Sequence, residues 1–335
     1  MRSTMTALLL CISLMVFSIS CSKKAERAIK YKELTIKKLS VDYVSRDIPF
    51  AGVVKRDRHN IFLRARNVWH IDLKEKTEKV IFKDGVGPDE ILKPLKIRLW
   101  KNDCYINSSY PLNYIYKFNP TSQKEKLERF NIDKFCYFDD FEFISENLIA
   151  MANVYWKDGL LRIYDTDKGT VKEIGKPHLV QMMMKFNVNA ASLCIYDGMI
   201  YLVESITPEI RVVSVADLKS VNLIRLSPPF YVPLPKKYNV QKYDLKNHRK
   251  WMASWTSISN IMVNNGWLLI SYKWGYNWGY AYELINLQNT WERYYIKRCS
   301  NHIYGFEIEG NRITFDLVEE TDQGDLKWQK AETFI

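Results

Sequence analysis

The stretch Leu161–Ile174, LRIYDTDKGTVKEI, has the pattern of a β-hairpin. Leu161, Ile163 and the ring of Tyr164 form a short apolar strand, residues 165–169 supply a turn, and residues 171–174 form the returning strand. The same pattern recurs at residues 69–82, 116–130, 213–226 and 284–296. A hairpin repeated in this way predicts a fold made of copies of one small sheet.

The spacing of a second repeated feature predicts how many copies there are. Six segments begin with a polar turn and continue as an apolar strand, near residues 59, 102, 146, 197, 265 and 310. The steps between them are about 42, 45, 51, 68 and 45 residues, which is the period of a four-stranded propeller blade. We therefore expect an all-β, six-bladed β-propeller with four-stranded antiparallel blades and few helices.

The last segment leaves too little chain for a complete blade. About 25 residues follow Asn311, enough for two or three strands, with Leu326–Ile335 the last. We expect an N-terminal strand near Leu34–Leu39 to complete the sixth blade. This closure of the ring would remove an exposed sheet edge.

Composition limits the function classes. The chain has 335 residues, of which 47% are hydrophobic, and a net charge of +11. The basic residues are scattered, which is typical of a solvated surface. The alternative is affinity for anionic partners such as acidic glycans or lipid head groups. Because no nucleic-acid-binding motif accompanies the charge, we do not expect a nucleic-acid partner.

Residues 1–20 have the pattern of a removed signal peptide, with Arg2 before an apolar run too short to span a bilayer. Small residues before Cys21 resemble the lipobox of bacterial lipoproteins, although Ser18 stands where Leu is commonest. The resemblance implies cleavage before Cys21 and attachment of acyl chains such as palmitate there. The alternative is an ordinary secretory signal with an incidental cysteine.

The expected domain organisation follows from this N-terminus. Residues 21–30 would be a linker after the lipidated cysteine, and residues 31–335 a single propeller domain. Lys23 and Lys24 follow the cysteine, where surface-exported lipoproteins often have acidic residues. We therefore expect a protein of the bacterial envelope, anchored in the outer membrane and facing the periplasm.

The long fourth step contains an insertion around residues 228–256. Four prolines within residues 228–235 exclude a central strand, and residues 243–255 could form a short helix. Loops on a rigid scaffold often hold binding sites. The insertion and the nearby stretch 272–280 are rich in aromatic residues. The ligand-binding candidates are Arg249, Trp251, Trp255, Trp274, Tyr276 and Trp278. The alternative is that their rings fill gaps between blades.

The stretch 82–91, FKDGVGPDEI, resembles a Gly-x-Gly-Pro-Gly-Glu phrase of the six-bladed β-propeller lipoproteins of Bacteroidetes, which have an NHL-like propeller shape. Gly85, Gly87, Pro88 and Glu90 match, and Asp89 replaces a glycine. The resemblance implies the fold and an envelope location, and little about chemistry. We expect the motif to shape a connection between blades, with glycines at positive φ and the proline fixing the turn.

The search for catalytic groups gives few candidates. The sequence has no local metal motif and no nucleophile elbow. His59, Glu146, Asp197 and His302 lie near blade openings and could converge on a metal, as one residue from each blade. The pairs Asp139-Asp140 and Glu319-Glu320 should point to opposite faces of a strand and be solvated. Cys104 and Cys194 lie in strand-like runs and should be small buried side chains.

Together these patterns predict a non-enzymatic envelope lipoprotein without catalytic residues, metal or cofactor. Its partners would be the membrane, through Cys21, and a glycan, peptide or envelope protein bound at one rim. The alternative is a metal-dependent propeller enzyme, similar to a lactonase or lyase, with its site in the central channel.

Overall fold

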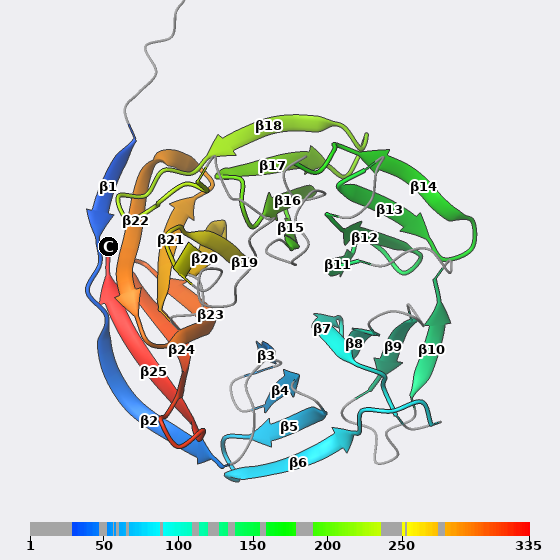
Figure 1. Cartoon of the computed structure of the whole chain (residues 1–335), viewed down its shortest axis with the longest axis horizontal. Helices are drawn as coiled ribbons and strands as arrows, with labels where there is room; N and C mark the ends of the chain where they lie inside the picture. Colours follow the sequence, from blue (N-terminus) through cyan, green and yellow to red (C-terminus); the bar gives the residue numbers. More distant parts are fainter. Residues whose placement is uncertain are drawn as a thin grey trace, which may run out of the picture.

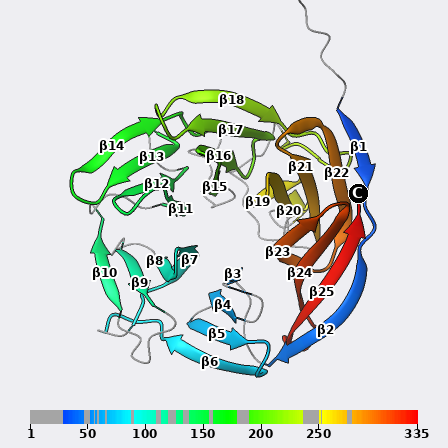
Figure 2. The ribbon, with the colours of Figure 1, turned by 180° about the vertical axis from the view of Figure 1, so that it is seen from behind.

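The computed structural model is a ring of six β-sheets around a central axis (Figure 1). It describes residues 29–46, 52–55, 57, 60–64, 67–87, 90–108, 114–119, 127–132, 138–154, 159–178, 190–235, 250–251, 253–273 and 279–335. The view from behind shows the same closed ring, with β1 and β2 on its outer edge (Figure 2). The prediction of an all-β, six-bladed propeller is therefore confirmed.

In blades 1 to 4, four antiparallel strands run in sequence order from the centre of the ring outward. Blade 1 contains β3 (Gly52–Lys55), β4 (Asn60–Arg64), β5 (Val68–Asp72) and β6 (Thr77–Phe82). Blade 2 contains β7 (Pro94–Trp100), β8 (Asp103–Ser108), β9 (Tyr114–Phe118) and β10 (Glu128–Asn131). Blade 3 contains β11 (Asp140–Phe143), β12 (Leu148–Ala152), β13 (Leu161–Asp165) and β14 (Gly169–Ile174).

The second half of the ring follows the same plan, with additions from the N-terminal segment. Blade 4 contains β15 (Ala191–Tyr196), β16 (Met199–Glu204), β17 (Glu209–Ser214) and β18 (Ser220–Arg225). Blade 5 contains β19 (Ser257–Asn264), β20 (Trp267–Lys273), β21 (Tyr280–Asn286) and β22 (Asn289–Cys299), and β1 (Lys30–Glu33) joins it. Blade 6 contains β23 (His302–Glu309), β24 (Arg312–Glu320), β25 (Leu326–Phe334) and β2 (Lys37–Ser45).

The antiparallel order gives the ring two different ends. At one end, the first strand of a blade turns into the second, and the third turns into the fourth; we call this end the turn face. We call the connection face the opposite end, where the second strand leads to the third and one blade leads to the next. Lys273, Tyr280 and residues 299–302 therefore lie at the connection face, and the 165–169 turn lies at the turn face.

The hairpin at residues 161–174 forms β13 and β14, as predicted. Oδ1 of Asp165 accepts hydrogen bonds from two backbone N–H groups of the turn, at 2.9 and 3.1 Å, and Gly169 has a φ of 84°. Asp72 makes the equivalent pair of bonds in the hairpin of β5 and β6, at 2.9 and 3.0 Å. A side chain that caps its own turn explains why the pattern is visible in the sequence.

The repeated openings mark a different point of the blade from the one expected. They are the turns between the first and second strands, where Asn265 and Gly266, for example, both have positive φ (47° and 77°). Each blade therefore begins one strand earlier, and blade 6 begins at His302 rather than near Asn311. This shift leaves the C-terminal end with three strands, and a fourth has to come from elsewhere.

The N-terminal strand β2 supplies it, which confirms the predicted closure of the last blade. It pairs with β25 from Lys37 opposite Glu332 to Ser45 opposite Leu326. It starts three residues later than the expected strand. Inside the blade, Nε1 of Trp328 donates a hydrogen bond to Oγ of Ser45 at 2.8 Å. The N-terminal strand β2 and the C-terminal strand β25 are thus held in one sheet.

A fifth strand in blade 5 was not foreseen. β1 pairs in parallel with the outer strand β22. The hydroxyl of Tyr31 donates to Oε1 of Glu283 at 3.0 Å, and Nη1 of Arg293 donates to the same oxygen at 3.0 Å. Glu283 and Arg293 are almost completely buried, so this network fixes the N-terminal segment to blade 5.

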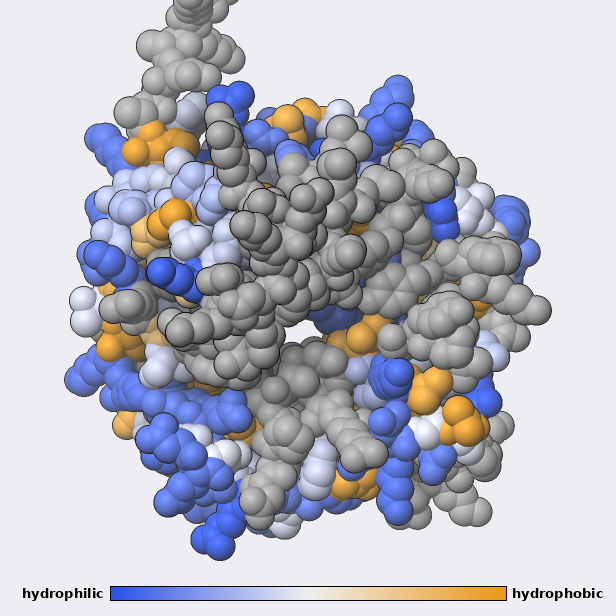
Figure 3. Space-filling model, viewed as in Figure 1, coloured by the Kyte–Doolittle hydropathy of each residue, from blue (hydrophilic) through white to orange (hydrophobic). Residues whose placement is uncertain are grey.

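The hydrophobic core is divided among the contacts between blades. Six clusters of buried side chains each join two neighbouring blades, including blade 6 with blade 1 through Ile71 and Trp328. A blade alone would expose both faces, so the ring is the unit that buries them. Hydrophilic residues occupy much of the outer edge (Figure 3).

Within the described residues, helix is limited to residues 250–251. No helix of that part of the chain is long and apolar enough to cross a membrane. Cys104 and Cys194 are buried, as expected, whereas Cys299 is half-buried, and none of these three described cysteines is in a disulfide.

Candidate functional site

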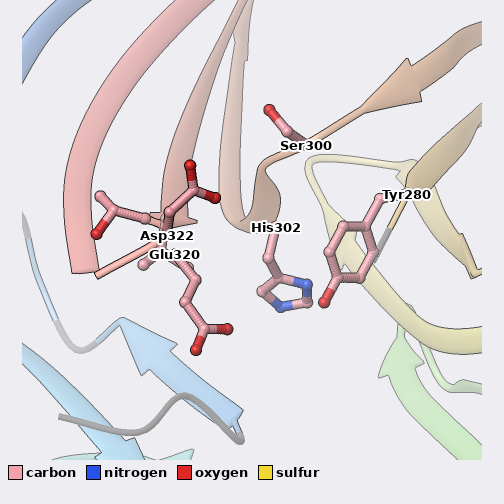
Figure 4. Close-up of a pocket in the computed structure, with 7 residues that line it drawn as sticks. Tyr280, Ser300, His302, Glu320 and Asp322 are labelled. Carbon is pink, nitrogen blue, oxygen red and sulfur yellow. The ribbon is translucent and has the colours of Figure 1, made fainter. Parts of the chain in front are cut away.

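A pocket of about 340 Å³ opens at the connection face between blades 5 and 6 (Figure 4). Its walls come from the start of β21, the link between β22 and β23, and the end of β24 with the turn that follows. The lining residues are Tyr280, Ser300, His302, Val318, Glu320, Thr321 and Asp322. The volume lies at the lower end of the range for small-molecule sites, about 300–1,000 Å³. We call this the mouth pocket.

Tyr282 fixes the link that holds His302. Its buried hydroxyl donates to the carbonyl oxygen of Asn301 at 2.8 Å and accepts from the backbone N–H of Ile303 at 2.9 Å. These bonds lie on both sides of His302. Its imidazole packs against the ring of Tyr280, with 5.2 Å between centroids, and Figure 4 shows the Tyr280 hydroxyl directed toward it.

The other wall is acidic. Glu320 ends β24, and a tight turn places Thr321 and Asp322 beside it. The backbone N–H of Thr321 donates to the carbonyl of Asp325 at 2.8 Å, and its Oγ1 accepts from the N–H of Asp325 at 3.1 Å. Glu320 and Asp322 are exposed, so their carboxylates are open to a ligand.

Burial sets the protonation states in the mouth pocket. Burial, with the positive charges of Lys273 and Lys96, lowers the pKa of His302 to about 3. Burial and the negative charge of Glu320 raise the pKa of Tyr280 to about 12. At neutral pH the pocket therefore offers a neutral imidazole, a protonated phenol and carboxylates. This set can bind hydroxyl and amino groups of a ligand.

A group of charged side chains lines the channel near the same end of the ring. Arg98 of β7 donates from Nη2 to both carboxylate oxygens of Asp140, the first residue of β11, at 2.6 Å each. Nζ of Lys96 lies 3.4 Å from Oδ2 of Asp140. Ser192 donates to the same oxygen at 2.8 Å. Blades 2, 3 and 4 thus meet at one buried carboxylate.

The neighbouring carboxyls respond differently to burial. Burial raises the pKa of Glu142 to about 7, although Arg98 opposes the rise. Burial also raises the pKa of Asp139 to about 6, against hydrogen bonds from two backbone N–H groups. Burial acts to raise the pKa of Asp140 too, but Arg98, Lys96 and the hydrogen bond from Ser192 outweigh it and lower the pKa.

The contacts of these buried side chains show that the expectation of solvated Asp139 and Asp140 was wrong. Their side chains do point in different directions, toward different partners. Asp140 faces Arg98, whereas Asp139 accepts hydrogen bonds from the backbone N–H groups of Val154 and Ala191, at 3.3 and 3.1 Å. Both are largely enclosed because the inner end of β11 is covered by its neighbours.

Four of the six ligand-binding candidates fall outside the described residues. These are Arg249, Trp274, Tyr276 and Trp278, and the lipidation candidate Cys21 also lies outside them. Trp251 is half-buried, and Trp255 is 1% exposed and packs against it with 5.6 Å between ring centroids. The ring of Trp255 is therefore buried and is not at the surface.

The two ends of the insertion are joined to each other and to blade 5. Val232 and Thr256 are linked by two hydrogen bonds, from the N–H of Thr256 to the Val232 carbonyl at 2.9 Å and from the N–H of Val232 to Oγ1 of Thr256 at 3.1 Å. The buried ring of Phe230 lies edge-on to Tyr272, with 5.1 Å between centroids. Tyr272 belongs to β20, so the start of the insertion packs on blade 5.

The glycine motif connects blade 1 to blade 2, as expected, but for a different physical reason. Gly85 and Gly87 are not among the glycines with positive φ. A Cβ on Gly85 would lie 2.1 Å from Oε2 of Glu90, and this oxygen accepts the N–H of Gly87 at 2.8 Å. The glycines therefore leave space for the Glu90 carboxylate. Pro88 lies outside the described residues.

Of the four residues considered for a metal, the three that the structure describes do not come together. Glu146 and Asp197 lie in turns at the turn face, whereas His302 begins β23 at the connection face, and His59 is outside the described residues. Among the residues that the structure describes, no group of three His, Cys, Asp or Glu side chains could hold a metal ion.

Sequence reasoning identified only part of the mouth pocket. It singled out the stretch that ends at Tyr280, the pair Glu319-Glu320, and His302, but for other reasons. It missed Ser300 and Asp322. Local sequence could not have combined these residues, because they come from two blades and become neighbours only when the ring forms.

Comparisons with known proteins support the fold. No family model and no curated protein matches the sequence. A "putative exported protein" from Bacteroides fragilis NCTC 9343, known from its crystal structure, superposes with a TM-score of 0.54 and 10% identity, over 93% of this chain and 96% of that one. The CNH domain of AfRom2 covers 90% of this chain and 99% of its own, with 9% identity and a TM-score of 0.43. At such low identity the first likeness shows a common fold.

Proposed function

We propose that the protein is a non-enzymatic lipoprotein of the bacterial envelope, whose propeller binds a glycan, a peptide or a partner protein at the connection face of blades 5 and 6. The observation that supports this is the mouth pocket, whose lining residue Tyr280 closely follows the Trp-rich stretch 274–278 in the sequence. Lys273 and Tyr280 flank that stretch, and Tyr280 also lines the pocket.

The pocket favours ligands that donate hydrogen bonds. Glu320 and Asp322 offer carboxylate oxygens, while the phenol of Tyr280 remains protonated and the imidazole of His302 neutral. Hydroxyl groups of a sugar or the amino group of a peptide would suit this lining. The aromatic ring of Tyr280 adds a flat apolar surface beside them.

A lipid anchor at Cys21 would suit this arrangement. β1 runs parallel to β22, and β22 begins at the turn face, so the N-terminal segment enters blade 5 on that side. The mouth pocket lies at the opposite end of the ring. An anchor nine residues before Lys30 would hold the turn face toward the outer membrane and leave the pocket open to the periplasm.

The anchor has a direct test. Cys21→Ala should abolish detergent partitioning of the mature protein, because two or three acyl chains are needed for stable membrane attachment. The wild-type protein serves as the control. Continued fractionation of the variant with membranes would show that the anchor proposal is wrong.

The binding site is tested with variants of the pocket. Wild-type protein is screened on a glycan array and against envelope peptides, and each hit is measured again with Tyr280→Phe and Glu320→Gln. Both changes should weaken binding at least about ten-fold, or about 1.4 kcal/mol, by removing one polar partner each. Glu309→Gln, an exposed change at the turn face of blade 6, should leave binding unchanged.

Two results would reject this site: no binding partner in the screen and in a pull-down from envelope extract, or binding that is the same in both pocket variants. The double variant Trp274→Ala, Trp278→Ala tests the adjacent stretch and should weaken binding without unfolding the protein. Loss of the fold would instead assign these rings to the core.

The alternative of a metal-dependent enzyme in the channel has a separate test. The channel carboxylate Asp140 is occupied by Arg98 and Lys96, which leaves it a poor metal ligand. Metal analysis of the purified protein distinguishes the two functions, because stoichiometric calcium or zinc would favour the enzyme.

A further inference from the structure

A second pocket lies at the turn face, at the other end of the same pair of blades. Its volume is about 320 Å³, and its walls come from β20, β21 and β22 of blade 5 and from the first turn of blade 6. It contains two aromatic rings, Trp267 and Tyr294, whose centroids are 6.1 Å apart. We call it the turn-face pocket. It shares no lining residue with the mouth pocket.

Three amide side chains surround the rings. Asn286 ends β21 and its Cα is paired with that of Trp267, Asn289 begins β22, and Asn311 comes from the turn of blade 6. Oδ1 of Asn286 accepts the backbone N–H of Gln288 at 2.9 Å, which leaves its NH₂ group as the part able to donate to a ligand. An amide offers both donors and an acceptor.

The charges in the pocket neutralise each other. Nζ of Lys32, from the added strand β1, lies 2.9 Å from Oε1 of Glu292, and the hydroxyl of Tyr294 donates to the same oxygen at 3.0 Å. The ammonium group also lies 5.6 Å from the centre of the Tyr294 ring. Because Lys32 and Glu292 are paired with each other, these two side chains give no preference for a charged ligand.

We propose that the turn-face pocket binds one unit of a neutral saccharide. A pyranose ring has an apolar face of C–H groups and an edge of hydroxyl groups that both donate and accept hydrogen bonds. The ring of Trp267 suits the apolar face, and the amides of Asn286, Asn289 and Asn311 suit the hydroxyl edge. Glu292 adds an acceptor. The pocket volume is at the lower end of the range for small-molecule sites, about 300–1,000 Å³, as expected for a single sugar unit.

The position of the pocket gives the proposal a consequence for the N-terminal segment. Lys32 forms part of the wall, so a bound sugar would contact β1 as well as blades 5 and 6. Hydrogen exchange of the backbone amide of Leu34, which donates to the carbonyl of Tyr295 at 2.8 Å, should slow when the sugar is bound.

Saturation-transfer difference NMR tests the proposal with four named sugars: D-glucose, D-galactose, D-mannose and N-acetyl-D-glucosamine. Wild-type protein should give a signal with at least one of them. Trp267→Ala and Asn289→Ala should each reduce the affinity for that sugar at least ten-fold. Because Trp267 also packs against the core, Asn289→Ala, which changes an exposed side chain, keeps the test independent of folding.

Matched controls identify the site. Trp291→Ala removes a Trp from the same strand, β22, that is 41% exposed and does not line the pocket, so it should leave the affinity unchanged. Glu320→Gln, in the mouth pocket, should also leave it unchanged, which separates this site from the proposed function. The proposal is overturned if none of the four sugars binds, if Trp267→Ala and Asn289→Ala bind as well as wild type, or if adenosine displaces the sugar and binds more tightly.

Discussion

At the scale of single residues, the buried pair of Asp140 and Arg98 has the largest predicted effect on stability. Asp140 is fully buried and accepts hydrogen bonds from Arg98, Ser192 and two backbone N–H groups. A buried charge without its partner costs far more than the net contribution of the pair. Three blades depend on this one carboxylate.

Asp140→Asn should therefore lower the free energy of unfolding by about 3–5 kcal/mol, because it leaves the Arg98 guanidinium without its main counter-charge. Urea denaturation at neutral pH measures the change. Glu75→Gln, in an exposed pair with Lys74, is the control and should change stability by less than about 0.5 kcal/mol. A loss below about 1 kcal/mol for Asp140→Asn would mean that the pair is not formed.

Glu142 gives a pH-dependent prediction. Burial raises its pKa to about 7 from an ordinary value of 4.5. Between these values the folded protein binds more protons than the unfolded chain, so stability falls as pH rises through this range. Glu142→Gln cannot ionise and should escape this loss. Between about pH 4.5 and about pH 8, the free energy of unfolding of the variant should therefore rise by about 1–3 kcal/mol relative to that of the wild type.

Urea denaturation of both proteins at the two pH values gives this difference directly. The neighbouring carboxyl Asp139 and the imidazole of His302 titrate in both proteins, so their contributions cancel to first order in the comparison. If the free energies of unfolding of variant and wild type differ by the same amount at both pH values, Glu142 has an ordinary pKa and faces solvent.

The residue-level expectations from sequence were right where the cause is local. Asp139 and Asp140 do contact different partners, although Asp139 precedes β11 and is not a strand neighbour as expected. Strand alternation could not show that both are enclosed, because the covering groups belong to other blades: Arg98 is 42 residues from Asp140 along the chain, and Ser192 is 52. Local sequence patterns predict the direction of a side chain, whereas its contacts depend on how the blades are arranged in the ring.

At the scale of elements, the hairpin of the third and fourth strands was the most reliable sequence feature. Its turn is capped by its own side chain at Asp72 and at Asp165, so all the determining groups lie within a few residues. The boundary between blades was placed one strand too late. Turns with positive φ are conspicuous in sequence, whereas the connections between blades vary in length and composition.

The connection from blade 1 to blade 2 gives a prediction at this scale. Gly85→Ala should lower the free energy of unfolding by about 1–3 kcal/mol, because the new Cβ displaces the Glu90 carboxylate and leaves the N–H of Gly87 without its acceptor. Thermal and urea denaturation measure the loss.

A double variant checks the cause. In Gly85→Ala, Glu90→Ala the clash is absent, so the effects of the two changes should not add, and the coupling should be at least about 0.5 kcal/mol. Additive losses would show that the carboxylate is not what restricts this position to glycine.

At the scale of the whole molecule, the ring explains both the stability and the two candidate sites. Six hydrophobic clusters join each blade to the next, and both pockets lie between blades 5 and 6, at opposite ends. The number of blades was predictable because the repeat has a period. The pockets were not, because their residues are brought together only by the angle between neighbouring blades.

The central claim is that the N-terminal strand β2 and the C-terminal strand β25 close the ring in one sheet, and a cysteine cross-link tests it most directly. Lys37 and Glu332 are opposite each other in β2 and β25, where Cα atoms lie about 4.5–5.5 Å apart, within disulfide range. The variant Lys37→Cys, Glu332→Cys should form an intramolecular disulfide in the folded monomer, identified by mass spectrometry of the linked peptides. The control Lys79→Cys, Glu332→Cys, with the first cysteine on the outer strand of blade 1, should not. A failure of the first pair to link, or equal linking of both pairs, would contradict the closed ring.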